Sequence, residues 1–134
     1  MSLLEACVGS YASSKAAYQG GADRLELCAN LVIGGTTPSR ALFLQVQRDF
    51  DIKINVMIRP RFGDFLYDDA ELEEMCAEIA SFRDLGANGV VFGVLTPEGE
   101  LDVDALRPIY AAARAAAKAA GRPVVCTLHR AFDI

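Results

Sequence analysis

Two arginines and an aspartate follow directly after an apolar run, and their side chains are suited to binding an anion. The run from Ile54 to Ile58 predicts a strand, and Arg59, Arg61 and Asp64 come next. Guanidinium groups on a backbone that Pro60 stiffens are suited to carboxylate or phosphate oxygens. The alternative is that both arginines pair with buried glutamates elsewhere in the fold, and the two roles can coexist at one site.

Two glutamates, Glu5 and Glu26, lie within the first two apolar runs of the chain. We expect their strands to be neighbours and both side chains to point to the inside of the fold. Such a pair could act as general acid and base with raised pKa values. It could equally form a layer of structural salt bridges, because buried carboxylates need partners. The candidate partners are Arg59, Arg61, His129 and Arg130.

A cysteine follows each of these glutamates at the same spacing. Cys7 comes two residues after Glu5, and Cys28 comes two residues after Glu26. On adjacent strands the two sulfur atoms could face each other. A pair of thiolates suits Cu(I) better than Zn²⁺, because structural zinc sites use four ligands. The alternative is that both cysteines pack in the core, as we expect for the remaining two, Cys76 and Cys126.

The only histidine, His129, ends the last apolar run and is followed by Arg130 and Asp133. A histidine at the mouth of a site could be an acid, a base or a ligand, and the alternative is a hydrogen-bonded core histidine. Asp64 and Asp133 each follow the end of a predicted strand, so both would lie in loops at the same mouth. We expect Arg130 to join the two arginines of the 59–64 segment in binding an anionic ligand.

Apolar runs that predict strands alternate with segments that predict helices along the whole chain. The strands are expected at residues 3–8, 24–28, 51–58, 90–94 and 123–129. Regular alternation with short turns predicts parallel strands joined by right-handed crossovers. Both an open doubly wound sheet and a (β/α)8 barrel have this pattern. No G-x-G-x-x-G motif follows the first strand, which disfavours a dinucleotide-binding sheet.

Polar residues at alternate strand positions favour the barrel, because they would point into it and toward its carboxyl-end mouth. A full barrel needs roughly 250 residues and eight strands. The 134 residues therefore predict an α/β fold of the (β/α)8 TIM-barrel type, of which only the N-terminal half is present. This half would hold about four and a half βα units in a single partial domain, residues 1–134. Alternatively, two copies could complete each other as a dimer of half-barrels.

Composition narrows the class of protein. The formal net charge is −5, and 52% of the residues are hydrophobic. Without a basic stripe, nucleic-acid binding is disfavoured. No apolar stretch reaches the roughly 18 residues of a membrane span, and the N-terminus does not resemble a signal peptide. We therefore expect a cytoplasmic protein whose four cysteines are thiols.

Several blocks together resemble the copper homeostasis protein CutC family along the whole chain. They are residues 5–8, 20–28, 34–39, 57–67, 91–95 and 127–133. The resemblance implies a (β/α)8 barrel, a cytoplasmic setting, and assembly as dimers or higher oligomers. It also implies a Cu(I) site whose two cysteines match Cys7 and Cys28. The family usually has an aspartate before the serine of the first block, where this chain has Gly9 and Ser10, and it continues well beyond residue 134.

Three functions follow as hypotheses. The first is a copper-binding protein of copper homeostasis that holds Cu(I) with a cysteine pair at the barrel mouth. The second is a barrel enzyme of unknown reaction acting on a small anionic substrate, for which the polar mouth residues are the candidates. The third is a shortened product without activity of its own. The mouth residues are Glu5, Glu26, Arg59, Arg61, Asp64, His129 and Asp133.

Overall fold

Five parallel strands form one sheet whose spatial order is the same as their order in the sequence. The computed structural model describes residues 2–121 and 124–133, and the side chains of 116–120, 132 and 133 lie outside this description. The strands are β1 (Glu5–Val8), β2 (Arg24–Leu27), β3 (Lys53–Met57), β4 (Gly89–Phe92) and β5 (Val125–Leu128). Each strand pairs in parallel with the next one along the chain.

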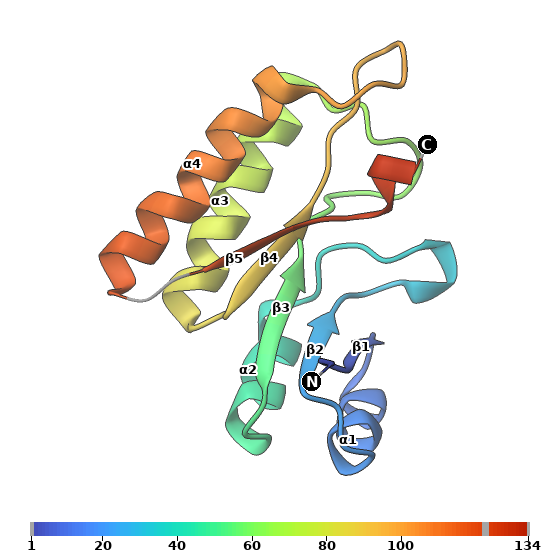
Figure 1. Ribbon diagram of the computed structural model, residues 1–134, viewed down its shortest axis with the longest axis vertical. Helices are drawn as coiled ribbons and strands as arrows, with labels where there is room; N and C mark the ends of the chain where they lie inside the picture. Colours follow the sequence, from blue (N-terminus) through green and yellow to red (C-terminus); the bar gives the residue numbers. More distant parts are fainter. Residues whose placement is uncertain (1, 122–123, 134) are drawn as a thin grey trace.

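Each pair of neighbouring strands is joined by one long helix. The helices are α1 (Tyr11–Gln19), α2 (Arg40–Asp49), α3 (Asp69–Leu85) and α4 (Val103–Ala120), and two short 3₁₀ turns are η1 (Leu31–Ile33) and η2 (Arg130–Asp133). Figure 1 shows α3 and α4 side by side along β4 and β5, with α2 beside β3 and α1 below β1 and β2. Consecutive strand order with right-handed crossovers puts all the helices on one face of the sheet. This is the arc of a (β/α)8 barrel and not a doubly wound sheet, so the predicted fold class is confirmed.

The main hydrophobic core lies between the sheet and its helices. On the helix side, Leu27, Val56 and Val90 of three neighbouring strands are fully buried. Phe43 of α2 meets Phe82 of α3 edge to face, with ring centroids 5.5 Å apart. These side chains exclude water from the outer face of the sheet and fix the strands in register. The opposite face is therefore the one that can carry polar groups.

Side chains that accept backbone hydrogen bonds begin all four α-helices among the described residues. Asp68 accepts a bond from the N–H of Glu71 at 2.8 Å and caps α3. Ser10 caps α1: its hydroxyl accepts a bond from the N–H of Ser13, and the Ser13 hydroxyl accepts one from the N–H of Ser10. This capping box starts the helix directly after β1, which keeps the first crossover short.

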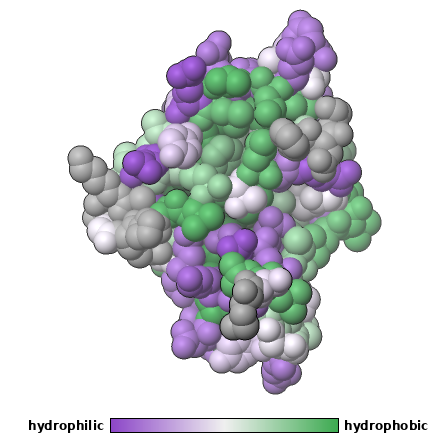
Figure 2. Space-filling view, in the orientation of Figure 1, coloured by the Kyte–Doolittle hydropathy of each residue, from purple (hydrophilic) through white to green (hydrophobic). Residues whose placement is uncertain are grey.

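Apolar residues gather on one part of the visible surface. Figure 2 shows them over the upper middle of the molecule, with polar residues at the top and over much of the lower part. The apolar turn Leu31–Ile33, which follows β2, is exposed. In the part of the chain that the structure describes, β1 and β5 each have a neighbouring strand on one side only, so each forms an open edge. Within the described residues, no helix is long and apolar enough to cross a membrane.

Candidate functional site

A cavity of about 390 Å³ opens on the inner face of the sheet, toward the carboxyl ends of the strands. This is the end at which (β/α)8 barrels carry their sites. Strands β1, β2, β3 and β5 contribute to the lining, together with the turn that follows β2 and the start of η2. The lining residues are Cys7, Glu26, Cys28, Leu31, Gly34, Met57, Thr127, Leu128, His129 and Arg130.

The two predicted cysteines both line this cavity, but they do not lie opposite each other. The strand register pairs Cys7 with Glu26, so Cys28 is displaced along β2 by two residues. Cys7 is exposed, and its thiol donates to the Oε2 atom of Glu26 at 3.0 Å. Cys28 is fully buried, and its thiol lies 3.5 Å from the carbonyl oxygen of Val8. The cysteines are thus diagonal neighbours across β1 and β2.

Both thiols are protonated at neutral pH. Partial burial of the sulfur atom, and then the hydrogen bond to Glu26, raise the pKa of Cys7 from its ordinary value of 9.0 to about 12. Burial, and then the charge of Glu26, raise the pKa of Cys28 to about 11. A metal would have to displace these protons in order to bind. Neither thiol is an activated nucleophile, because the thiolate is the reactive form.

The donor set at the cavity fits a soft ion of low coordination number. Within residues 2–121 and 124–133, no group of three His, Cys, Asp or Glu side chains is placed to hold a metal ion. A tetrahedral zinc site is therefore not formed there, because zinc takes four such ligands. Two thiols with a thioether beside them are the donors that Cu(I) prefers.

Glu5 lies away from the cavity. Its carboxylate forms an ion pair with Arg24 of the neighbouring strand, and Asn55 donates to it at 3.3 Å. The sequence suggested Arg59, Arg61, His129 or Arg130 as partners for the two glutamates, but Glu5 uses Arg24 and Glu26 accepts from Cys7. Glu5 therefore joins β1, β2 and β3 at their amino-terminal half.

Arg59 is buried and binds the protein's own backbone. Its guanidinium donates to the carbonyl oxygens of Ile33 at 3.2 Å, Gly35 at 2.9 Å and Gly63 at 2.8 Å. It also lies 4.9 Å from the ring centre of Phe65. These bonds tie the loop after β2 to the loop after β3, so most of the donors of Arg59 are already used.

Arg61 and Asp64 also bind within their own loop. Arg61 forms ion pairs with Asp64 at 3.1 Å and with Glu71 at 2.7 Å. It donates to the carbonyl oxygen of Leu66 at 2.6 Å and lies over the ring of Tyr67. Neither Arg61 nor Asp64 lines the cavity. We predicted that the arginines of the 59–64 segment bind an anion. In the structure, Arg61 instead holds the loop between β3 and α3 in place.

His129 lines the cavity and is only 9% exposed. Its Nδ1 atom accepts a hydrogen bond from the N–H of Ala131 at 3.2 Å, and its ring packs on Phe65 with centroids 4.9 Å apart. Burial, and then the positive charge of Arg59, lower the pKa of His129 from 6.5 to about 4. The ring is therefore neutral at pH 7, with its proton on Nε2, and that buried atom has no partner among the described residues.

Arg130 is exposed at the mouth of the cavity. A side-chain carbon placed on Gly34 would lie 3.2 Å from the Nη1 atom of Arg130 and 3.3 Å from the Nη1 atom of Arg59. Two guanidinium groups therefore converge on this glycine, and a side chain there would require them to shift. The positive φ of 94° also favours glycine at this position. The side chain of Asp133, the remaining predicted mouth residue, lies outside the described part of the structure.

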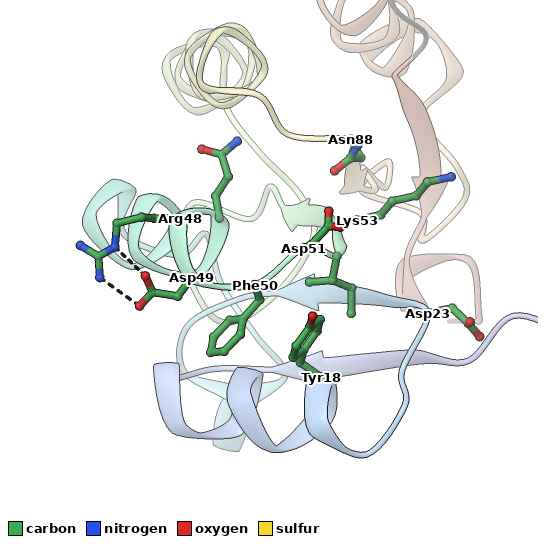
Figure 3. A pocket seen from close by; sticks show the side chains of 10 residues that line it. Tyr18, Asp23, Arg48, Asp49, Phe50, Asp51, Lys53 and Asn88 are labelled. Atoms are coloured by element: carbon green, nitrogen blue, oxygen red, sulfur yellow. Dashed lines mark hydrogen bonds and ion pairs between the residues drawn. The ribbon is translucent and has the colours of Figure 1, made fainter.

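A larger hollow of about 760 Å³ lies at the opposite end of the strands (Figure 3). Tyr18, Asp49, Phe50 and Lys53 are among the residues that line it. The ion pair of Asp49 with Arg48, at 2.6 Å, occupies one rim. Barrels place their chemistry at the other end, so we assign no site to this hollow.

Met57 is a cavity residue to which the sequence analysis gave no role. It shares a strand face with Asn55 and Arg59, which alternation along β3 predicts. In the register of β2 with β3, Leu27 is paired with Val56. One residue further along both strands, Met57 lies beside Cys28, so knowledge of the register would have identified Met57 as a cavity residue. Register is not visible in a single sequence.

Comparisons with known proteins agree with the fold. The family model described as the CutC family matches residues 2–134. A copper homeostasis protein cutC homolog from Homo sapiens is 46% identical over 132 residues, which cover 98% of this chain and 45% of that protein. A family protein CutC from Chromobacterium violaceum is also 46% identical, and the match covers 98% of this chain and 50% of that protein. The chain spans about half the length of these curated relatives.

Solved structures give the same result. The provisionally named copper homeostasis protein CutC from Streptococcus agalactiae superposes with a TM-score of 0.84 at 34% identity, covering 99% of this chain and 61% of that one. A provisionally named phosphonomutase from Burkholderia cenocepacia J2315 superposes with a TM-score of 0.66 at 25% identity, covering 94% and 53%. With a family match over nearly all its residues, the chain belongs to the CutC family.

Proposed function

We propose that this chain serves copper homeostasis by binding Cu(I) through Cys7 and Cys28. The observation that carries the proposal is that both thiols line one cavity at the carboxyl ends of adjacent strands. Relatives of the same family are named as copper homeostasis proteins. The proposed setting is a reducing compartment such as the cytoplasm, where thiols stay free.

Binding requires both thiols to lose their protons. Glu26 accepts the hydrogen bond of the Cys7 thiol at 3.0 Å, so its carboxylate is placed to take that proton. Cys7 is exposed, whereas Cys28 lies at the buried side of the cavity. We infer that an incoming ion meets Cys7 first and then reaches Cys28. Bound copper would carry no catalytic step here, because the ion is the cargo of the protein.

An anaerobic Cu(I) titration against a competing chelator tests this proposal. Cys7→Ser and Cys28→Ser should each weaken binding by at least about tenfold, since each removes a thiolate ligand. Cys76→Ser and Cys126→Ser are the matched controls, because these cysteines pack against the main core on the other side of the sheet. Equal affinity in all four variants would contradict a thiol site.

A second candidate is an enzyme of the barrel type that acts on a small anionic substrate. Two observations favour it: the Nε2–H group of His129 has no acceptor among the described residues, and the Arg130 guanidinium lies at the same cavity. The likeness to a provisionally named phosphonomutase fits a ligand with anionic oxygens. The neutral imidazole and the guanidinium would both donate to such a ligand.

Binding of inorganic phosphate and of a small dicarboxylate, measured by calorimetry, tests the second candidate. Arg130→Ala should abolish binding of whichever anion the chain takes. Arg40→Ala is the matched control, because Arg40 is an exposed arginine on α2 away from the cavity. Binding that both variants retain, or that neither anion shows, would remove this candidate.

We also propose that the chain forms a homo-oligomer. The two open edges of the sheet support this proposal, because apolar side chains are exposed there beside unpaired strand backbone. These side chains are Leu3 and Leu4 next to β1, and Val125 and Leu128 on β5. Burial of such edges is a common reason for strands to associate.

A further inference from the structure

Met57 brings a third sulfur atom to the cavity. It is the last residue of β3, and the register of β2 with β3, continued one residue past Leu27 and Val56, places it beside Cys28. Both residues line the cavity, and Met57 is only 6% exposed. A side-chain carbon placed on Gly35 would lie 3.5 Å from the sulfur of Cys28 and 3.5 Å from the terminal methyl of Met57. The two side chains therefore meet at the same point.

The surroundings of Met57 differ from those of an ordinary core methionine. The main core lies on the helix side of the sheet and contains Leu27, Val56 and Val90. Met57 faces the other way, in a separate small cluster with Cys28 and Val91. Methionine often fills irregular gaps in cores. Here its thioether instead lies among cavity residues, next to a thiol.

The strand geometry makes Met57 a closer neighbour of Cys28 than Cys7 is. Adjacent strands lie about 4.8 Å apart, and residues in register are separated by that spacing alone. Continued one residue beyond the pair Leu27–Val56, the register of β2 with β3 sets Met57 opposite Cys28, and the two side chains share one buried cluster. Cys7 is paired with Glu26 and is diagonal to Cys28. A metal held by the two cysteines would therefore lie within the reach of the flexible side chain of Met57.

The histidine of the cavity does not offer a free donor atom to the same ion. His129 accepts a hydrogen bond at Nδ1, so the ring proton is on Nε2. A metal would need the lone pair of one of these nitrogens, and both are already occupied. The donors that remain for a soft cation are the two thiols and the thioether, which are the ligand types that select Cu(I).

We propose that Met57 completes a three-sulfur Cu(I) site with Cys7 and Cys28. The inference rests on the proposed function, because it concerns the same ion. Met57 carries no charge and no proton to lose, so it adds a ligand without adding a pH-dependent step. Its place beside the buried Cys28 would also hold the ion at the inner end of the cavity.

The test is the Met57→Leu variant, which keeps an apolar side chain of similar volume and removes only the sulfur. Met75→Leu is the matched control, because Met75 is fully buried in the main core on α3. X-ray absorption at the copper edge should count three sulfur neighbours in the unchanged chain and in Met75→Leu, and two in Met57→Leu. The Cu(I) affinity of Met57→Leu should fall by about tenfold or more.

A second measurement does not depend on any variant folding. The chain contains three methionines, and all can be replaced by selenomethionine during expression. A copper–selenium contact in the absorption spectrum is then the expected result, and its absence would overturn the assignment of Met57. If the unchanged chain binds no Cu(I), or if Cys7→Ser and Cys28→Ser leave binding intact, the proposed function itself is wrong. Cysteine-dependent binding without selenium contact overturns the role of Met57 alone.

Discussion

Glu26 controls the state of the Cys7 thiol. The hydrogen bond between them and the negative charge of the carboxylate both add to burial in raising the pKa of Cys7 to about 12. A thiol in this state reacts slowly with electrophiles at neutral pH, because only the thiolate attacks. The same carboxylate that suppresses this reactivity is placed to accept the proton when a metal binds.

Glu26→Gln should therefore speed the alkylation of Cys7. The variant removes the charge that opposes ionisation, so the pKa of Cys7 falls and more thiolate is present. We expect at least about a tenfold faster reaction with iodoacetamide at pH 8, corresponding to about one pKa unit. Mass spectrometry can follow each cysteine separately, and Cys126 serves as the internal reference. An unchanged rate at Cys7 would contradict the contact between Glu26 and Cys7.

His129 should make the stability of the fold depend on pH. Its pKa is about 4 in the folded chain and has the ordinary value of 6.5 once the chain unfolds. Between these values the unfolded chain binds a proton that the folded chain does not, so the free energy of unfolding falls as the pH is lowered. The loss across this window is about 3 kcal/mol.

Urea unfolding at a series of pH values measures this effect. The His129→Gln variant has no imidazole to protonate. Its free energy of unfolding should therefore change less between pH 6.5 and 4 than that of the unchanged chain. Asp49 does not confuse the comparison, because the hydrogen bonds from Arg48 and Tyr11 lower its pKa to about 2, below the window. The same pH slope in the variant and the unchanged chain would show that His129 is not buried as a neutral ring.

At the scale of elements, the loops after β2 and β3 depend on one buried side chain. Arg59 donates to backbone carbonyls in both loops, including those of Gly35 and Gly63. Gly35 and Gly63 have positive φ values of 89° and 101°, which leave their carbonyls turned toward the guanidinium. The loops thereby form the rim of the cavity that holds Cys28 and Met57.

Replacing Arg59 by methionine should destabilise the protein by about 2–4 kcal/mol, because buried carbonyl groups lose charged donors. Arg107→Met, at an exposed position on α4, is the matched control and should change the stability by less than about 0.5 kcal/mol. Thermal unfolding measures both. A mild effect of Arg59→Met would mean that these loops are held by other contacts.

The order and type of the elements could be predicted from the sequence, whereas several site contacts could not. Alternation along the strands placed Cys7, Glu26 and Cys28 on the inner face, and Figure 1 shows the predicted succession of strands and helices. The partners of Arg59 are backbone carbonyls, which every sequence contains. The partner of Glu5 is set by the strand register, which pairs it with Arg24. Neither kind of contact leaves a pattern in a single chain.

At the scale of the whole molecule, the sheet has two open edges. Val125 and Leu128 on β5 are 48% and 40% exposed, and β1 forms the other edge. If these edges mediate the proposed self-association, Val125→Lys should shift the chain toward the monomer, because a buried edge does not accept a lysine. Analytical ultracentrifugation measures this shift. Ala111→Lys, at an exposed position on α4, adds the same single charge and is the control.

We propose that copper is held by sulfur atoms of the cavity on the inner face of the sheet. The most direct measurement is an anaerobic Cu(I) titration of the chain against a competing chelator, beside the Cys7→Ser/Cys28→Ser double variant. We expect the unchanged chain to bind one Cu(I) ion tightly, and we expect the double variant not to bind it. Weak binding, or binding that the double variant retains, would contradict the account.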